Sequence, residues 1–184
     1  MMGRALLIVG LMSTLGVIVS AVMGYLLSSP VDADMPRHVL VALASSLLLL
    51  FSHCWIMFYL IGTGKAIKDA VRENGLDPAV TEAIIEETKR FKNASYPSLM
   101  LAMGLVMATF ILGGGVATGS VPAWVHHVLF YLAVLVQGYA LRIEWRVLGE
   151  NERLMIDVDR RLATAPALPL HSGRGDQLLL RRDE

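Results

Sequence analysis

The stretch VLVALASSLLLLFSHCWIMFYLI (residues 39–61) is 23 residues long and contains no Asp, Glu, Lys or Arg. Three further stretches share this property, at residues 5–27, 96–116 and 123–141. About 20 helical residues cross the ~30 Å hydrocarbon core of a bilayer, and only closed hydrogen-bonded structures are stable there. The sequence therefore predicts an all-α fold: an integral membrane four-helix bundle.

The composition of the chain agrees with this prediction. Its hydrophobic fraction is 55% and its mean hydropathy is +0.57, which are high values for a soluble domain. The net charge is zero, so we expect no nucleic acid as a partner, and the expected partner is the lipid bilayer. The first apolar run is longer than the apolar core of a signal peptide, roughly 7–15 residues, and we expect an uncleaved first helix.

Basic residues are distributed unequally between the links that join the spans. The link between the first two spans contains Arg37 as its one basic residue, and the link between the last two contains none. The middle link contains six: Lys65, Lys68, Arg72, Lys89, Arg90 and Lys92. Because cytoplasmic loops are enriched in Lys and Arg, we expect both termini and the middle link to be cytoplasmic. The expected location is a bacterial-type cytoplasmic (inner) membrane.

We divide the chain into three parts. Residues 1–147 form the four-span domain, which includes a cytoplasmic helical hairpin at 64–93. Residues 148–163 form a cytoplasmic amphipathic helix, and residues 164–184 form a disordered tail. The amphipathic helix has an apolar stripe formed by Leu148, Met155, Val158 and Leu162. We expect this stripe to pack on the chain's own hairpin, with a docking site for a partner as the alternative.

Four local signals predict where the helices begin and end. The glycines at 62–64 are expected to interrupt the second span and act as a hinge, and Asn74-Gly75 predicts a turn. Asp77 precedes a proline and is expected to be the N-cap of the next helix. Pro97 is expected to lie at the start of the third span.

Small residues recur every four positions on two of the spans. Gly16, Ser20 and Gly24 form one such row, and Gly104 and Ala108 form another. Rows of small residues let helix backbones approach closely in lipid. We expect the rows to pack inside the bundle, with homo-oligomerisation through the first span as the alternative.

Three histidines are expected at the outer ends of the spans. His38 with His126 or His127 could supply two imidazoles from different helices at one depth, which is what a b-type haem requires; a metal site is a further option. The alternative is that these histidines meet water and lipid headgroups. Adjacent residues diverge by about 100° on a helix. We therefore expect only His126 of the neighbouring pair to face the interior, because Gln137 and Glu144 share its face.

His53 lies deeper in the membrane than the other histidines of the spans. Polar residues inside a bilayer are costly and are candidates for function. We expect a buried, neutral His53 hydrogen-bonded to Gln137 or Ser98, with a ligand or proton-relay role as the alternative. Within Ser52-His53-Cys54 we expect no catalytic triad, because the sequence indicates no partner carboxylate at that depth.

The architecture resembles that of the membrane-anchor subunits of respiratory complexes. This resemblance concerns architecture alone and does not establish function. The leading expectation is a non-catalytic integral membrane subunit that anchors or assembles a larger complex in electron transport, with haem b as its candidate cofactor. Its partners would be other membrane-protein subunits or a second copy of the chain. The alternative function is a small membrane transporter or channel that uses His53 and Gln137 as its polar site.

Overall fold

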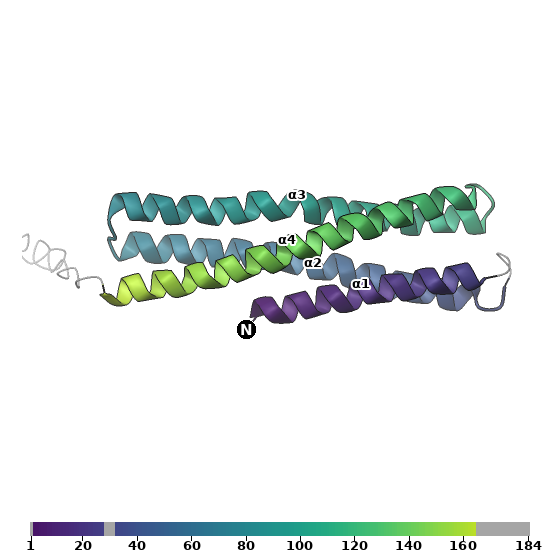
Figure 1. Cartoon of the computed structure of the whole chain (residues 1–184), viewed down its shortest axis with the longest axis horizontal. Helices are drawn as coiled ribbons and strands as arrows, with labels where there is room; N and C mark the ends of the chain where they lie inside the picture. Colours follow the sequence, from purple (N-terminus) through teal and green to yellow (C-terminus); the bar gives the residue numbers. More distant parts are fainter. Residues whose placement is uncertain (1, 28–31, 165–184) are drawn as a thin grey trace, which may run out of the picture.

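A computed structural model describes residues 2–27 and 32–164 of the chain. Within these ranges the chain forms four helices and no strand (Figure 1). Each helix contains a segment long and apolar enough to cross a membrane, so the predicted all-α membrane bundle is confirmed. Most of the predicted tail lies outside the described residues. The helices are α1 (Met2–Leu26), α2 (Met35–Glu73), α3 (Pro78–Ala117) and α4 (Ala123–Thr164).

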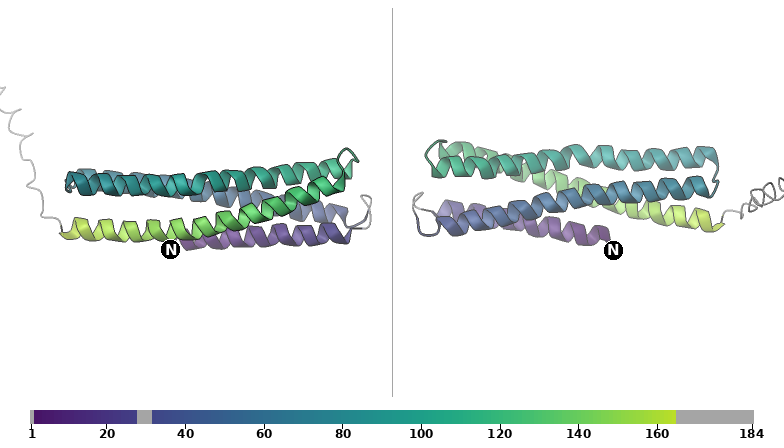
Figure 2. Two further views of the ribbon diagram at one scale, coloured as in Figure 1. Left: turned by 45° about the horizontal axis from the view of Figure 1, so that its top comes forward. Right: turned by 180° about the vertical axis from the view of Figure 1, so that it is seen from behind.

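The four helices differ in length, and this gives the bundle two unlike halves. Helices α2, α3 and α4 run the whole length of the bundle. Helix α1 spans only half of it, because α1 begins near the middle, where the N-terminus lies (Figures 1 and 2). We call the end where α2 and α4 begin the histidine end, because His38 and His126 lie there. The opposite end, where residues 74–77 join α2 to α3, is the turn end. The molecule thus has four helices at the histidine end and three at the turn end.

Helices α2 and α3 are continuous through residues 62–64 and through Pro97, so the expected interruption at 62–64 is wrong, and the helix that contains the third span begins at Pro78. Gly64 is buried in α2, and a Cβ there would lie 3.6 Å from Thr88 Cβ on α3. Pro97 lies inside α3 and is exposed, two residues after Ser95, whose hydroxyl donates to Phe91 O (2.8 Å). Membrane helices tolerate proline because neighbouring groups satisfy the freed backbone.

The turn between α2 and α3 has the predicted local chemistry. Gly75 has a φ of 61°, a left-handed conformation that glycine adopts without steric cost. Asp77 is the N-cap of α3, and its carboxylate accepts from Ala79 N (2.9 Å) and Val80 N (3.3 Å). The turn signal and the N-cap are therefore confirmed.

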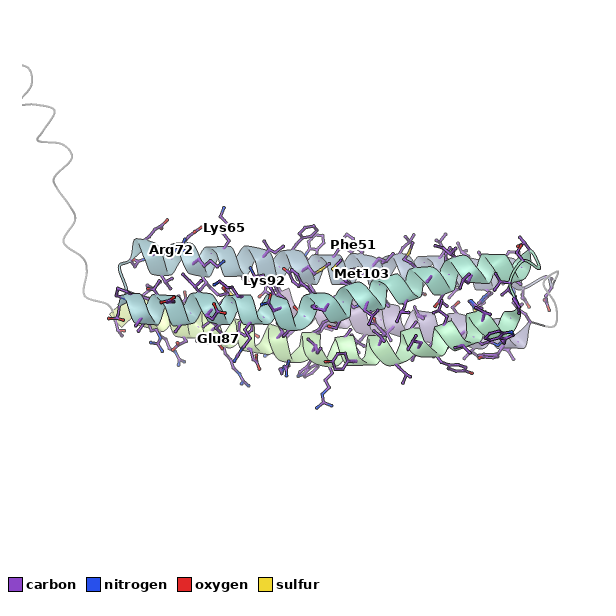
Figure 3. The ribbon with its side chains drawn as sticks, turned by 90° about the horizontal axis from the view of Figure 1, so that it is seen from above. Phe51, Lys65, Arg72, Glu87, Lys92 and Met103 are labelled. Atoms are coloured by element: carbon purple, nitrogen blue, oxygen red, sulfur yellow. The ribbon has the colours of Figure 1, made fainter. Side chains whose placement is uncertain are left out.

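Charged and apolar side chains separate along the bundle. Figure 3 shows labelled charged residues toward the turn end and labelled apolar ones near the middle; the charged ones are Lys65, Arg72, Glu87 and Lys92, and the apolar ones Phe51 and Met103. Large apolar side chains are exposed on the four-helix half, Leu135 (72%) among them. An exposed apolar surface of this kind is what a lipid-facing protein presents.

The α4 stripe packs within the chain, as expected. Leu148 and Val158 are buried in the larger apolar cluster, and Leu162 packs against it. Met155, the fourth member of the stripe, is 36% exposed. The turn-end half is therefore held together by its own apolar core.

The two rows of small residues have different surroundings. A Cβ on Gly16 would collide with Ser45 Oγ and lie 3.1 Å from Ser45 Cβ, so the α1 row packs tightly against α2. A Cβ on Gly104 would meet nothing within 4 Å. The prediction of internal packing is thus confirmed for the α1 row and wrong for Gly104.

Candidate functional site

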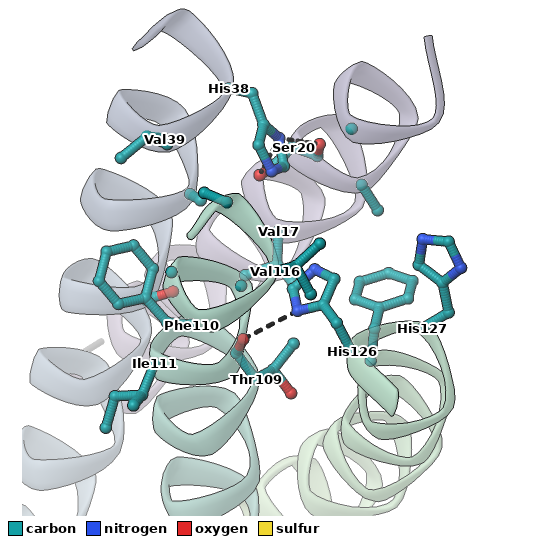
Figure 4. A pocket seen from close by; sticks show the side chains of 18 of the residues that line it. Val17, Ser20, His38, Val39, Thr109, Phe110, Ile111, Val116, His126 and His127 are labelled. Atoms are coloured by element: carbon teal, nitrogen blue, oxygen red, sulfur yellow. Dashed lines mark hydrogen bonds between the residues drawn. The ribbon is translucent and has the colours of Figure 1, made fainter. Parts of the chain in front are cut away.

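A cavity of about 520 Å³ lies among the four helices at the histidine end (Figure 4). Its lining includes His38 from α2 and both His126 and His127 from α4, together with many apolar side chains. The structure thus brings together the three histidines that the sequence placed at one depth. Cofactor sites in proteins usually have volumes of about 300–1,000 Å³ and a mostly apolar lining. We refer to this site as the histidine cavity.

His38 is held by the backbone of α1. Its Nδ1 lies 2.8 Å from Ser20 O, and because a carbonyl only accepts, Nδ1 carries the donated hydrogen. The ring lies against Gly24, where a Cβ would come within 2.9 Å of His38 Cε1. Glycine therefore makes room for the imidazole, and Nε2 of the neutral ring keeps its lone pair.

His126 is held by α3 in the same way. Its Nδ1 donates to Thr109 O (3.0 Å; dashed in Figure 4), and a Cβ on Gly113 would lie 3.0 Å from His126 Cε1. In both cases the accepting carbonyl belongs to a hydroxyl residue four positions before the glycine. The α1–α2 pair and the α3–α4 pair thus position one imidazole each by the same local arrangement.

This arrangement suits metal ligation. Histidines that bind metals almost always donate their second ring N–H to a carbonyl, a carboxylate or water, which fixes the tautomer and leaves the other nitrogen to bind. Imidazole is one of the ligand types that haem iron takes in proteins. Among residues 2–27 and 32–164, no group of three or more His, Cys, Asp or Glu could hold a bare metal ion. The cavity therefore offers two anchored imidazoles and many apolar side chains.

His127 also lines the cavity, so the expectation that only His126 would face it is too strict. The His127 ring packs against Tyr25, with 4.9 Å between ring centroids. The Tyr25 hydroxyl in turn lies 2.6 Å from that of Tyr131. His127 of α4 therefore packs against α1, whereas His126 bonds to the backbone of α3.

A second group of polar side chains is buried toward the middle of the bundle. His53 Nε2 lies 2.9 Å from Gln137 Oε1, which confirms the predicted hydrogen bond. Gln137 Nε2 donates to Thr14 Oγ1 (3.1 Å), and the Thr14 hydroxyl donates to Gly10 O (2.8 Å). His53 and Gln137 are 0% and 2% exposed. Helices α1, α2 and α4 thus meet in one hydrogen-bonded chain.

Glu144 belongs to this group, and the expectation that no carboxylate lies at the depth of His53 is wrong. Its Oε1 lies 2.6 Å from His53 Nδ1, and both side chains are fully buried. The charge-free run of the fourth span ends at residue 141, so Glu144 was assigned to the region beyond the membrane. Glu144 follows Gln137 by seven residues, or two helical turns, so the sequence placed both on one face, but the expected end of the span kept Glu144 from being paired with His53. We call His53, Gln137, Thr14 and Glu144 the buried polar network.

An apolar layer separates the network from the histidine cavity. Leu49, Val106 and Ala133 form a buried cluster, against which Val17 packs. Leu49 and Ala133 each lie one turn closer to the histidine end than the network residues of their helices. The cavity and the network are therefore two distinct sites.

Comparisons with protein-family models, with curated proteins and with solved structures find no match for this chain. Its function is therefore inferred from the chemistry of the two sites. The histidine cavity offers space and two imidazole lone pairs. The buried polar network offers an ionisable pair enclosed by protein.

Proposed function

We propose that the chain is an integral membrane subunit that holds a b-type haem in the histidine cavity, with His38 and His126 as axial ligands. The observation that carries this proposal is the matched anchoring of the two imidazoles, each bonded to a backbone carbonyl through Nδ1 with Nε2 left to bind. A bound haem would supply one-electron transfer. The residues of the chain bind the group, orient the two rings and surround it with apolar side chains.

A haem in a membrane subunit serves as an electron carrier, which needs a donor and an acceptor. We therefore propose that the chain anchors or assembles a larger membrane complex, with other membrane-protein subunits or a second copy as its partners. The concentration of basic residues near the turn end supports cytoplasmic termini in a bacterial-type inner membrane. The cytoplasmic part of the subunit would then be the three-helix half.

The visible absorption spectrum of the purified full chain tests the haem proposal. We expect a Soret band and an α-band that strengthens on reduction. His38→Ala and His126→Ala should each abolish these bands, because each removes one axial ligand. His127→Ala and His53→Ala are the matched controls and should keep them. A chain without any haem spectrum, or one that loses it through His127 and not through His126, would refute the assignment.

A small transporter or channel is the second candidate function. It is favoured by the bond between His53 and Gln137, since polar groups inside a membrane often mark the path of an ion or a substrate. The absorption measurement separates the two candidates. A chain without haem would favour the transporter, and bands that depend on His38 and His126 would favour the redox subunit.

A further inference from the structure

His53 and Glu144 are the only ionisable side chains among the buried residues of the described ranges. The buried residues that α1 and α3 contribute are apolar, glycine, serine or threonine, and none of them titrates. On α2 and α4 the other buried polar residues are serines, Gln137 and Asn151. The flanking Arg142 and Arg146 of α4 are exposed. The pair is therefore electrically isolated in the interior.

Other titratable groups near the middle of the bundle are partly buried and have partners elsewhere. The Cys54 thiol faces Met103 Sδ (3.9 Å), and the Tyr96 hydroxyl donates to Met57 O (3.1 Å). The Tyr25 hydroxyl belongs to the histidine end, beyond the apolar layer. The protonation of His53 and Glu144 therefore depends on the interaction between these two side chains and on the hydrogen bonds that they make with their neighbours.

The hydrogen-bond chain fixes the proton on one nitrogen of His53. The Thr14 hydroxyl donates to Gly10 O, so Thr14 Oγ1 accepts from Gln137 Nε2. Gln137 then presents Oε1 to His53, and because this oxygen can only accept, His53 Nε2 carries a hydrogen. The state of the other nitrogen, Nδ1, is decided by Glu144.

His53 Nδ1 and Glu144 Oε1 form a close ion-pair contact without the geometry of a hydrogen bond, and we assign one shared proton to this pair. The two atoms are 2.6 Å apart, and two lone pairs facing each other at that distance would repel. Either an imidazolium donates to a carboxylate, or a carboxylic acid donates to a neutral imidazole. Both arrangements leave the pair without net charge. Removal of this proton would leave one negative charge in a medium of low dielectric constant.

We propose that His53 and Glu144 form a proton-binding site, which takes up and releases one proton reversibly. On release, the bond from the shared hydrogen to Oε1 or Nδ1 breaks and the proton passes to water. This leaves a carboxylate beside a neutral imidazole that keeps its Nε2–H. The proposal depends on neither the haem nor its ligands, because the apolar layer separates the two sites.

The second oxygen of Glu144 supports exchange over a purely structural bond. Glu144 Oε2 is buried and has no hydrogen-bond partner among the described residues, and the same holds for Oε1 and His53 Nδ1, whose 2.6 Å contact is an ion pair without hydrogen-bond geometry. Buried polar atoms in proteins are nearly always satisfied, and an exception requires an explanation. Oε2 lies on the side of α1, 3.8 Å from where a Cβ of Gly10 would be. A proton acceptor with free capacity at this point is what a site of proton exchange needs.

Buried apolar side chains lie on both sides of the pair along the bundle. Toward the histidine end the apolar layer of Leu49, Val106 and Ala133 closes the bundle. Toward the turn end α1 stops at Met2, so only α2, α3 and α4 continue (Figure 1). The first turns of α1, which include Leu6 and Gly10, cover the pair on this side. On the turn-end side the larger apolar cluster, which includes Ile56, Leu60 and Leu99, adjoins the pair, so protein encloses the pair in both directions.

The test uses the full chain in lipid vesicles with ¹⁵N-labelled histidine, titrated over the pH range in which it stays folded. Nitrogen resonances give the protonation of His53 Nδ1 and Nε2, and infrared difference spectra give that of Glu144. We expect one coupled transition in which His53 Nε2 keeps its hydrogen while the shared proton is lost at high pH. Glu144→Gln should abolish this transition, since its amide can donate to Nδ1 but cannot titrate. Glu150→Gln changes a partly exposed residue about two turns further along α4 and should leave the transition unchanged.

Three results would overturn the proposal. The first is a pair that never changes protonation in the folded chain, which would make the contact structural only. The second is a transition that persists in Glu144→Gln, which would assign it to another group. If Glu144→Gln does not fold, His53→Gln replaces it, and an unchanged infrared midpoint for Glu144 in that variant is the third. None of these readouts involves haem, so the outcome is distinct from that of the absorption test.

Discussion

The histidine cavity and the buried polar network both contain histidine, but the imidazole has different partners in the two sites. His38 gives one ring nitrogen to a backbone carbonyl, and its other nitrogen is left to bind a ligand. His53 bonds to Gln137 at one nitrogen and contacts Glu144 at the other, and its side chain is fully buried. The partner of the second nitrogen therefore decides whether an imidazole can be a ligand or a proton carrier.

The largest expected effect comes from removing the carboxylate of the network. Glu144→Ala would leave His53 buried without a partner, which typically costs about 3–5 kcal/mol of folding free energy. Glu144→Gln should cost much less because its amide can still donate to Nδ1. Thermal and denaturant unfolding in detergent, followed by circular dichroism, measures the difference. Equal stability of the two variants would mean that the contact between His53 and Glu144 does not stabilise the interior. The network would then not differ from the cavity in how the second imidazole nitrogen is held.

A smaller loss of stability is expected when the contact that packs α1 against α2, beside both sites, is disrupted. Gly16→Leu would place a side chain where Ser45 already lies, and overpacking of this kind costs about 1–3 kcal/mol. Gly104→Leu is the matched control, because a Cβ there meets nothing within 4 Å. We expect a lower melting temperature for Gly16→Leu alone. A lowered melting temperature or a changed oligomer size for Gly104→Leu would instead reveal an interface between copies.

The smallest expected effect is a difference in reactivity without a change in stability. In a Cys54→Ala background, a cysteine introduced at Ala33 should react with a membrane-impermeant thiol reagent added outside cells. A cysteine at Gly75 should not, because the basic residues near the turn end favour a cytoplasmic location. The reverse pattern would place the histidine cavity on the cytoplasmic side.

The membrane-spanning fold could be predicted from the sequence because long apolar runs leave few alternatives. The pairing of His53 with Gln137 could be predicted as well, since depth and helix face follow from counting residues. Glu144 was missed because the absence of charge was used to mark the end of a span. A carboxylate that lies beside an imidazole does not need water, so the end of a charge-free run does not mark the end of the buried interior.

The continuity of α2 and α3 could not be predicted from local residue preferences. The glycines at 62–64 lower helix propensity by up to about 1 kcal/mol each, and packing in the three-helix core outweighs this. Pro97 faces outward, where its ring displaces no neighbour. Tertiary packing, which the local sequence does not record, decided both positions.

The repeated anchoring of the imidazoles also has a consequence for the order of assembly. The bonds of His38 and His126 to backbone carbonyls span 18 and 17 residues, so each forms inside one pair of adjacent helices. The bond between His53 and Gln137 spans 84 residues and forms only after the two pairs have met. Each hairpin can therefore enter the lipid with its imidazole already oriented. Docking of the hairpins then completes the cavity and encloses the network in a single step.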